Sequence, residues 1–239
     1  MSLGSIWDET QMGILDRENQ FVDYKGAKLD GDCFIALSTF SFVLFSAIVD
    51  HQNPIGFFTV KSSIITNVIE YANGGILQGD FVRSFLCPVY KFEDKFFILI
   101  EAECPKPNQF VEKIVSILNP RHITVFFSES TSQNLNNSKE NSENIQIRCH
   151  VFPSKDTFFA LPFRFSGFPA GIITLCPIHN IDYQLFYIEN ESLESSYDNI
   201  FSVIISELEK LLKIDSSAII QKAVSIMNER KATEKMILL

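Results

Sequence analysis

The sequence predicts an α/β fold: one domain over residues 1–239, built as a layered α/β/α sandwich with a mixed sheet and two C-terminal helices. Three observations carry this prediction. Apolar runs that suit buried strands alternate with helix-like stretches along the chain. Two strand-like runs are separated only by a short charged turn, which makes the sheet mixed rather than purely parallel. The last third of the chain is helix-like, and 239 residues can bury a substantial core.

The first part of the chain supplies strands and helices in alternation. Residues 1–30 are polar with scattered apolar positions and are predicted to be a loosely ordered lead-in. Three elements then follow in order, a buried strand, a buried helix and a short strand: "DCFIALST", "FSFVLFSAIVDHQNP" and "IGFFTV". The next stretch, "SSIITNVIEYANGG", is predicted as a helix with Ser62 or Ser63 as its N-cap and Gly74 at its end.

A hairpin comes next, with strands at Phe81–Tyr90 and Lys95–Ala102 and with Glu93 and Asp94 in its turn. An amphipathic helix and two strands are predicted at "KPNQFVEKIVSILNP", "HITVFFS" and "IQIRCHVF". Residues 128–144 are rich in Ser and Asn and hold too little apolar surface to order themselves, so a flexible surface insert is expected there.

The remaining elements are a loop, a strand and two helices. The Phe-rich "DTFFALPFRFSGFPA" is predicted as a loop that leads into a strand, "GIITLC". The two closing helices each have an apolar stripe and a capping Ser, in "SSYDNIFSVIISELEKLLKI" and "SSAIIQKAVSIMNER".

Composition excludes several classes of function. A net charge of −9 and a pI near 5.0 argue against nucleic-acid binding, which needs clustered Lys and Arg. The N-terminus lacks the basic start and apolar core of a signal peptide, and no apolar run is long enough to span a bilayer. The cysteines are odd in number and scattered, which suits reduced thiols in a reducing compartment better than a disulfide framework: Cys33, Cys87, Cys104, Cys149 and Cys176. These features indicate a soluble intracellular protein without membrane association.

Few residues carry a recognisable chemistry. The four histidines never fall at a metal-ligand spacing and no C-x-x-C occurs, so neither a metal nor a cofactor is expected. Cys176 and His179 are three residues apart around a proline, so a catalytic pair of a Cys nucleophile and a His base stays possible. No nucleophile elbow is present in the sequence. Glu101 and Glu103 would share one face at the end of a strand, which is compatible with acid–base catalysis. Carboxylates at the end of a strand are more often simply exposed to solvent. The prediction is a binding protein with no catalytic residues.

The order of segments resembles the proteasome assembly chaperone 1 family. Three segments carry the resemblance: "CFIALSTFSFVLFSAIV", "FFILIEAECPKPNQFVEKIVSILNPRHITVFFSES" and "FFALPFRFSGFPAGIITLC". Family members have a leucine-proline pair, here Leu161-Pro162, and a later proline-alanine pair, here Pro169-Ala170, that leads into an apolar strand. They also close with two helices and a short tail, so the resemblance runs from Asp32 to the C-terminus.

The resemblance implies a non-enzymatic chaperone of 20S proteasome assembly. Such a protein pairs with a second, related chaperone as a heterodimer, and the pair sits on the outer face of the proteasome α-subunit ring. It promotes ring assembly and suppresses off-pathway ring association. A cytoplasmic location, with the nucleus as a second one, goes with this role.

The C-terminal tail, residues 228–239, is the site that the resemblance implies. Family members end in a hydrophobic–tyrosine–any motif that enters pockets between α-subunits, and the matching residues here are Ile237, Leu238 and Leu239. Leu238 stands at the tyrosine position and can fill a pocket without supplying the phenol's hydrogen bond. Residues 228–235 are polar, so they are either a spacer that lets the tip reach away or a continuation of the helix with the tip packed on its own core.

Two alternatives to the chaperone stay open at this point. One is a small α/β enzyme, either like a nucleoside phosphorylase or a hydrolase that uses Cys176 and His179. The other is an adaptor subunit of a different cytosolic complex that uses the same apolar tail.

Overall fold

The computed structural model describes ten stretches of the chain: residues 22–27, 30–49, 52–65, 69–70, 76–77, 80–100, 107–128, 146–153, 165–189 and 197–237. Eight strands form one sheet in the order β1-β3-β6-β7-β2-β8-β10-β9. Their bounds are β1 Val22–Gly26, β2 Asp32–Ala36, β3 Gly56–Ile65, β6 Asp80–Phe92, β7 Lys95–Leu99, β8 His122–Phe127, β9 Gln146–Phe152 and β10 Asp182–Glu189. A separate pair joins β4 (Ile69–Glu70) to β5 (Ile76–Leu77).

The sheet is mixed, as the sequence predicts. Its centre is parallel, because β2 pairs with β7 and β8, and β8 pairs with β10, all in the same direction. One side continues through the antiparallel strands β6, β3 and β1, and the other ends at antiparallel β9. Glu93 adopts a positive φ of 55° in the tight turn between β6 and β7, which confirms the predicted hairpin.

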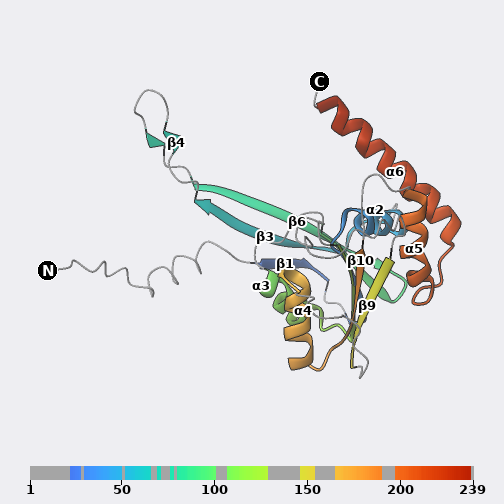
Figure 1. Ribbon diagram of the computed structural model, residues 1–239. Coiled ribbons are helices and arrows are strands. Elements are labelled where there is room, and N and C mark those ends of the chain that lie inside the picture. Colours follow the sequence, from blue (N-terminus) through green and yellow to red (C-terminus); the bar gives the residue numbers. More distant parts are fainter. Residues whose placement is uncertain are drawn as a thin grey trace, which may run out of the picture.

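Helices cover both faces of the sheet, so the α/β/α layering and the two C-terminal helices are confirmed (Figure 1). The helices are α2 Thr39–Ile48, α3 Pro107–Lys113 with its π-helical continuation η1 Ile114–Leu118, α4 Gly167–Ile178, α5 Tyr197–Glu209 and α6 Ser216–Ile237. One buried cluster joins α3, η1 and α4 to one face of the sheet, and the other joins α2, α5 and α6 to the opposite face.

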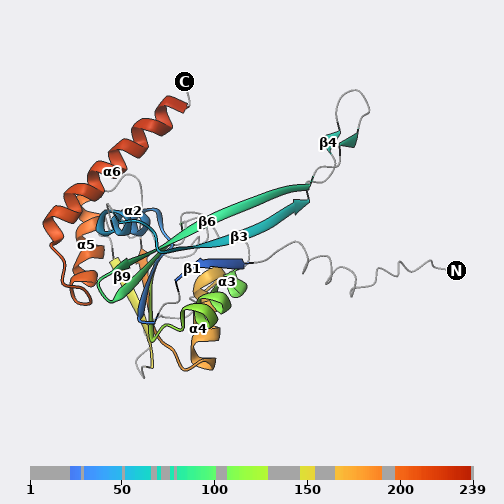
Figure 2. The ribbon, with the colours of Figure 1, turned by 180° about the vertical axis from the view of Figure 1, so that it is seen from behind.

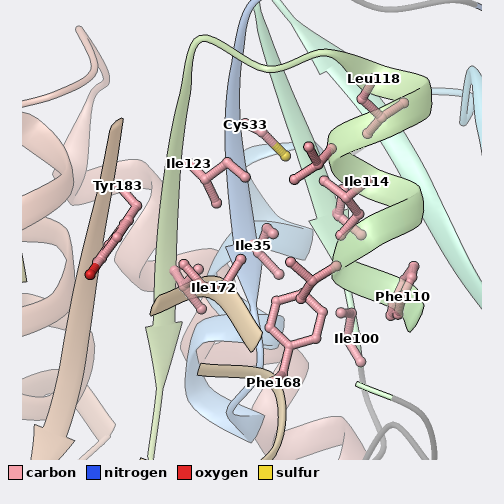
Figure 3. Close-up of a cluster of buried hydrophobic side chains, with 14 of the residues drawn as sticks. Cys33, Ile35, Ile100, Phe110, Ile114, Leu118, Ile123, Phe168, Ile172 and Tyr183 are labelled. Carbon is pink, nitrogen blue, oxygen red and sulfur yellow. The ribbon is translucent and has the colours of Figure 1, made fainter. Parts of the chain in front are cut away.

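The first cluster lies between the central strands and the pair α3–α4 (Figure 3). Ile35 and Ile123 project from β2 and β8 toward Phe110 of α3 and Phe168 of α4, whose ring centroids lie 5.7 Å apart. The two helices approach closely at Gly171, where a Cβ would come within 3.2 Å of Val111 Cγ2. The alternation of side chains along each strand places the aromatic residues of the second cluster on the other face.

The predicted helix after Ser62 or Ser63 is wrong, because β3 continues through Ile65 and pairs with β6 over ten residue pairs. The sequence there is rich in β-branched residues, which favour an extended chain when a partner strand is available. A long antiparallel partner therefore overrides the helix-like capping pattern. Gly74 lies outside the described residues.

The predicted strand "GIITLC" is also wrong, since these residues lie inside α4. A short, fully apolar run looks the same in a buried strand and in a buried helix. The chain enters α4 from Ser166 in an extended conformation, and Pro169 falls in the first turn, where backbone N–H groups have no acceptor within the helix. The strand in this part of the chain is β10, which follows α4 and which the sequence analysis did not identify.

The predicted lead-in contains one ordered element, because β1 forms within it and pairs with β3 from Val22↔Val60 to Gly26↔Gly56. Apart from Ser128, the predicted insert at residues 128–144 lies outside the described residues and remains a prediction. Among the described helices, none has both the length and the apolar character needed to cross a membrane.

Candidate functional site

Helix α6 carries the predicted C-terminal site, and the helix begins on an acidic cap. Asp215 Oδ1 accepts hydrogen bonds from the backbone N–H of Ser217 at 3.2 Å and from its hydroxyl at 2.9 Å. The predicted capping Ser is thus corrected to Asp215, whose carboxylate also suits the positive end of the helix dipole. The helix then packs on the second core cluster through Ala223 and Met227, which are both buried.

Two cations fix α6 against its neighbours at the point where it leaves the core. The Arg230 guanidinium carbon lies 5.1 Å from the ring centroid of Phe42 on α2. The Lys231 ammonium nitrogen lies 4.3 Å from the ring centroid of Tyr197 at the start of α5. Each contact has the geometry of a cation–π interaction. Together they hold α6 to both of the helices that flank it.

The helix continues beyond the buried Met227 as a projecting stalk, which we define as residues 228–237 and whose base holds Arg230 and Lys231. Ile237, the last helical residue, lies ten positions after Met227, so the stalk is about 15 Å long at 1.5 Å per residue. Both views show the far end of α6 standing clear of the sheet and of the other helices (Figures 1 and 2). The polar residues 228–235 are therefore helical, and the helix carries its end away from the body.

The tail residues stand at the end of this stalk. Ile237 closes the helix, while Leu238 and Leu239 lie outside the described residues. Their role in binding a partner remains a prediction. The sequence pattern alone allowed a polar spacer or a continued helix at residues 228–235, and the structure shows a continued helix.

The structure does not bring together the predicted cysteine and histidine pair. Cys176 lies fully buried inside α4, whereas His179 follows the helix and is exposed. Burial raises the pKa of the Cys176 thiol to about 12, so it stays protonated at neutral pH and is a poor nucleophile. Burial, followed by the nearby Cys176 and Asp32, also raises the pKa of Cys33.

The remaining candidate groups give no convergent site. Cys149 and His150 face opposite sides of β9, as adjacent strand residues must, and the His150 ring stacks on Tyr183 with centroids 5.6 Å apart. The carboxylates Glu101 and Glu103 and the pair Leu161-Pro162 lie outside the described residues. Within the described stretches, no group of three or more His, Cys, Asp or Glu side chains is placed to hold a metal ion.

The sequence analysis missed a second feature, which is exposed apolar surface on β3 and β6. Phe57 is 39% exposed and Leu86 is 66% exposed, and with Ile178 they are the large apolar side chains that stand out among the described residues. A signal was present in the sequence, because neighbouring Phe57 and Phe58 in a strand cannot both face the core. Phe58 is the one that is buried.

No family model matches the sequence, and no curated protein matches it. Solved structures do match the fold. PbaA of Pyrococcus furiosus, described as an archaeal homologue of proteasome-assembly chaperone, superposes with a TM-score of 0.58 at 10% identity, over 90% of this chain and 92% of that chain. PbaB of the same organism, described as an archaeal proteasome activator, gives 0.57 at 9% identity, over 90% and 99%.

A third similar structure is a protein of unknown function from Thermoplasma acidophilum, with a TM-score of 0.53 at 14% identity over 99% of this chain and 96% of that chain. At these identities the likeness is one of fold. The structural neighbours of the chain include homologues of proteasome-assembly chaperones, which agrees with the family resemblance in the sequence.

Proposed function

We propose that the protein is a non-enzymatic chaperone that pairs with a second, related chaperone and promotes assembly of the 20S proteasome core particle on the α-subunit ring. The fold of proteasome-assembly chaperone homologues and the segments that resemble that family support this proposal. The sites of action would be the cytoplasm and the nucleus, where proteasomes assemble.

The observation that carries the proposal is the stalk with its apolar end. A helix that leaves the core at Met227 continues for about 15 Å and ends at Ile237, away from the body. Apolar side chains contribute binding energy when they enter a partner's pocket and are removed from water there. Leu238 fills the central place of the tail without a hydroxyl, so the contact is apolar.

Surface charge supports a protein partner over a polyanion. The chain carries −9 overall, and the cations Arg230 and Lys231 are occupied by the rings of Phe42 and Tyr197. The enzyme alternative is not supported by Cys176 and His179, because the Cys176 thiol is buried and protonated while His179 is exposed at the C-cap of α4.

The test is capture of proteasome α-subunits by the purified chain, co-expressed with its related chaperone. Deletion of residues 237–239 should reduce the amount of α-subunit captured by tenfold or more, while the melting temperature stays the same. Ile178→Ser is the matched control, since Ile178 is also an exposed apolar residue but lies at the end of α4. Equal capture by the deletion variant would show that the tail is only a helix end.

A further inference from the structure

The stalk contains the only two adjacent basic residues of the sequence, Arg230 and Lys231, and a threonine follows them closely. Thr233 stands three positions after Arg230, and a third basic residue, Lys235, comes two positions after Thr233. Protein kinases that select basic substrates contact such positions with carboxylates of their substrate groove, because guanidinium and ammonium groups pair with carboxylates. The sequence R-K-x-T-x-K therefore has the charge pattern that these kinases bind.

The hydroxyl of Thr233 is accessible on the surface of α6, where the residue is exposed. Its Oγ1 donates a hydrogen bond to the Glu229 carbonyl at 3.0 Å, and a hydroxyl that donates keeps the lone pairs with which it can attack. The other hydroxyl residue that follows an arginine at this spacing is Thr124, after Arg121. Thr124 is only 1% exposed within β8, so the same spacing is inaccessible there.

The position of the pattern also allows a kinase to draw it into its groove, which requires an extended segment. Residues 230–235 all follow Met227, the last buried residue in the described part of α6, so they can unwind while the core stays closed. Ser225 gives the contrast on the same helix. It follows Lys222 by three positions, but Ala223 and Met227 on either side of it are buried, so extending this segment would unpack the helix.

We propose that Thr233 is a phosphorylation site for a protein kinase that selects basic residues. In the transfer, Thr233 Oγ1 attacks the γ-phosphorus of ATP and forms a new phosphorus–oxygen bond. The bond from this phosphorus to the oxygen that bridges it to the β-phosphate breaks, and ADP leaves with the electron pair. The hydroxyl proton passes to the catalytic carboxylate of the kinase. The product carries a charge of about −1.5 to −2 at neutral pH.

The new charge opposes the end of the helix in which it lies. Thr233 is four positions before Ile237, the last residue of α6, and the carboxyl end of a helix is the negative end of its dipole. Glu229, four positions earlier on the same side of the helix, adds repulsion between like charges. Arg230 has the opposite charge, and the phosphate competes with the ring of Phe42 for its guanidinium. Phosphorylation therefore loosens the end of α6 and its contact with α2.

The test is phosphorylation of the purified full chain by the catalytic domain of protein kinase C with Mg-ATP, located by mass spectrometry of peptides. It uses neither α-subunits nor the related chaperone, so its result does not depend on the proposed function. We expect phosphate on Thr233, with incorporation there tenfold or more slower in Arg230→Gln. Arg121→Gln is the matched control and should leave that rate unchanged, because Arg121 is also an exposed arginine three positions before a threonine. Circular dichroism spectra like that of the wild type would show that both variants fold.

Hydrogen exchange measures the effect on the stalk. The amides of residues 230–237 should exchange about tenfold faster in the phosphorylated chain, while β2 and β8 keep their protection. Thr233→Ala, treated with the kinase in the same way, should show no such change. The proposal is overturned if Thr233 stays unmodified under conditions that phosphorylate a standard basic peptide, or if Arg230→Gln incorporates phosphate there as fast as the wild type. Unchanged exchange in the phosphorylated chain would overturn the loosening of α6.

Discussion

The ring of Tyr24 lies over Gly56 on the neighbouring strand, where no other residue type leaves room for it. A Cβ at Gly56 would collide with the Tyr24 hydroxyl and lie 2.7 Å from Cζ of the ring. That hydroxyl donates a hydrogen bond to the Ala27 carbonyl at 2.9 Å, and the ring packs on Phe58 with centroids 4.7 Å apart. The glycine thus lets an aromatic side chain close the edge of the sheet where β1 ends.

Gly56→Ala should lower the free energy of unfolding by about 1–3 kcal/mol, since the added methyl group displaces the Tyr24 ring from its contacts. Urea unfolding followed by circular dichroism measures the change. Tyr24→Ala removes the obstacle, so adding Gly56→Ala to that variant should cost much less than it does in the wild type. Additive losses in this double-mutant cycle would contradict the proposed contact.

The buried start of α2 is the basis of a second prediction. Ser38 Oγ accepts from the Ser41 backbone N–H at 3.1 Å, and Ser41 Oγ accepts from the Ser38 N–H at 3.0 Å, which forms a reciprocal capping box. Ser38→Ala leaves a buried N–H without its acceptor and should cost about 1–2 kcal/mol of stability, as measured by thermal unfolding.

Ser46→Ala on the same helix is the control for this loss. The Ser46 hydroxyl donates to the Phe42 carbonyl at 2.8 Å, and that carbonyl keeps its position in the helix when the hydroxyl is removed. The control should change stability by less than about 0.5 kcal/mol. Equal losses in the two variants would show that the cap contributes nothing special.

The central strands could be predicted from the sequence because each is a short apolar run with clear breaks on both sides. β2 and β8 are of this kind, and so is the hairpin strand that begins at Lys95. Elements decided by a distant partner could not be predicted. β3 extends past Val60 because β6 lies beside it, and α4 is helical because its apolar surface packs between the sheet and α3.

The candidate site also has parts that could be predicted from the sequence and parts that could not. The residues of the tail could be found from their family pattern, whereas the rigid helix that carries Ile237 depends on contacts such as Arg230 over Phe42. Phe57 and Leu86 come together only through strand register, which a pattern of single residues does not encode.

Alkaline pH should destabilise the protein because its buried thiols resist ionisation. The pKa of Cys176 is raised to about 12, and that of Cys33 is raised too, in each case chiefly by burial. An unfolded thiol loses its proton near pH 8.5, so above that pH the folded state holds more protons than the unfolded state. The stability is thus complete below about pH 8.5 and falls as pH rises toward 12, by up to about 1.4 kcal/mol per pH unit for each thiol.

Urea unfolding at several pH values between 8 and 11 checks this prediction. Cys176→Ala should lower stability at pH 8 but give a shallower decline with pH, because one resisting thiol is gone. Ile172→Val removes a methyl group from the same buried face of α4 and should keep the steep decline of the wild type. Parallel curves for Cys176→Ala and the wild type would refute the assignment.

A substitution in the stalk can separate folding from function, because Ala232 is exposed and lies five positions after the buried Met227. Ala232→Pro removes a backbone hydrogen bond and clashes with the preceding turn, so it should break the stalk. We expect a lower helical signal in circular dichroism, a melting temperature close to that of the wild type, and a loss of α-subunit capture comparable to that of the tail deletion. Ala232→Gln keeps a good helix former at this position and should retain capture. Full capture by the proline variant would mean that the tail binds without a rigid support, so that the apolar residues alone, and not their placement by α6, determine the contact.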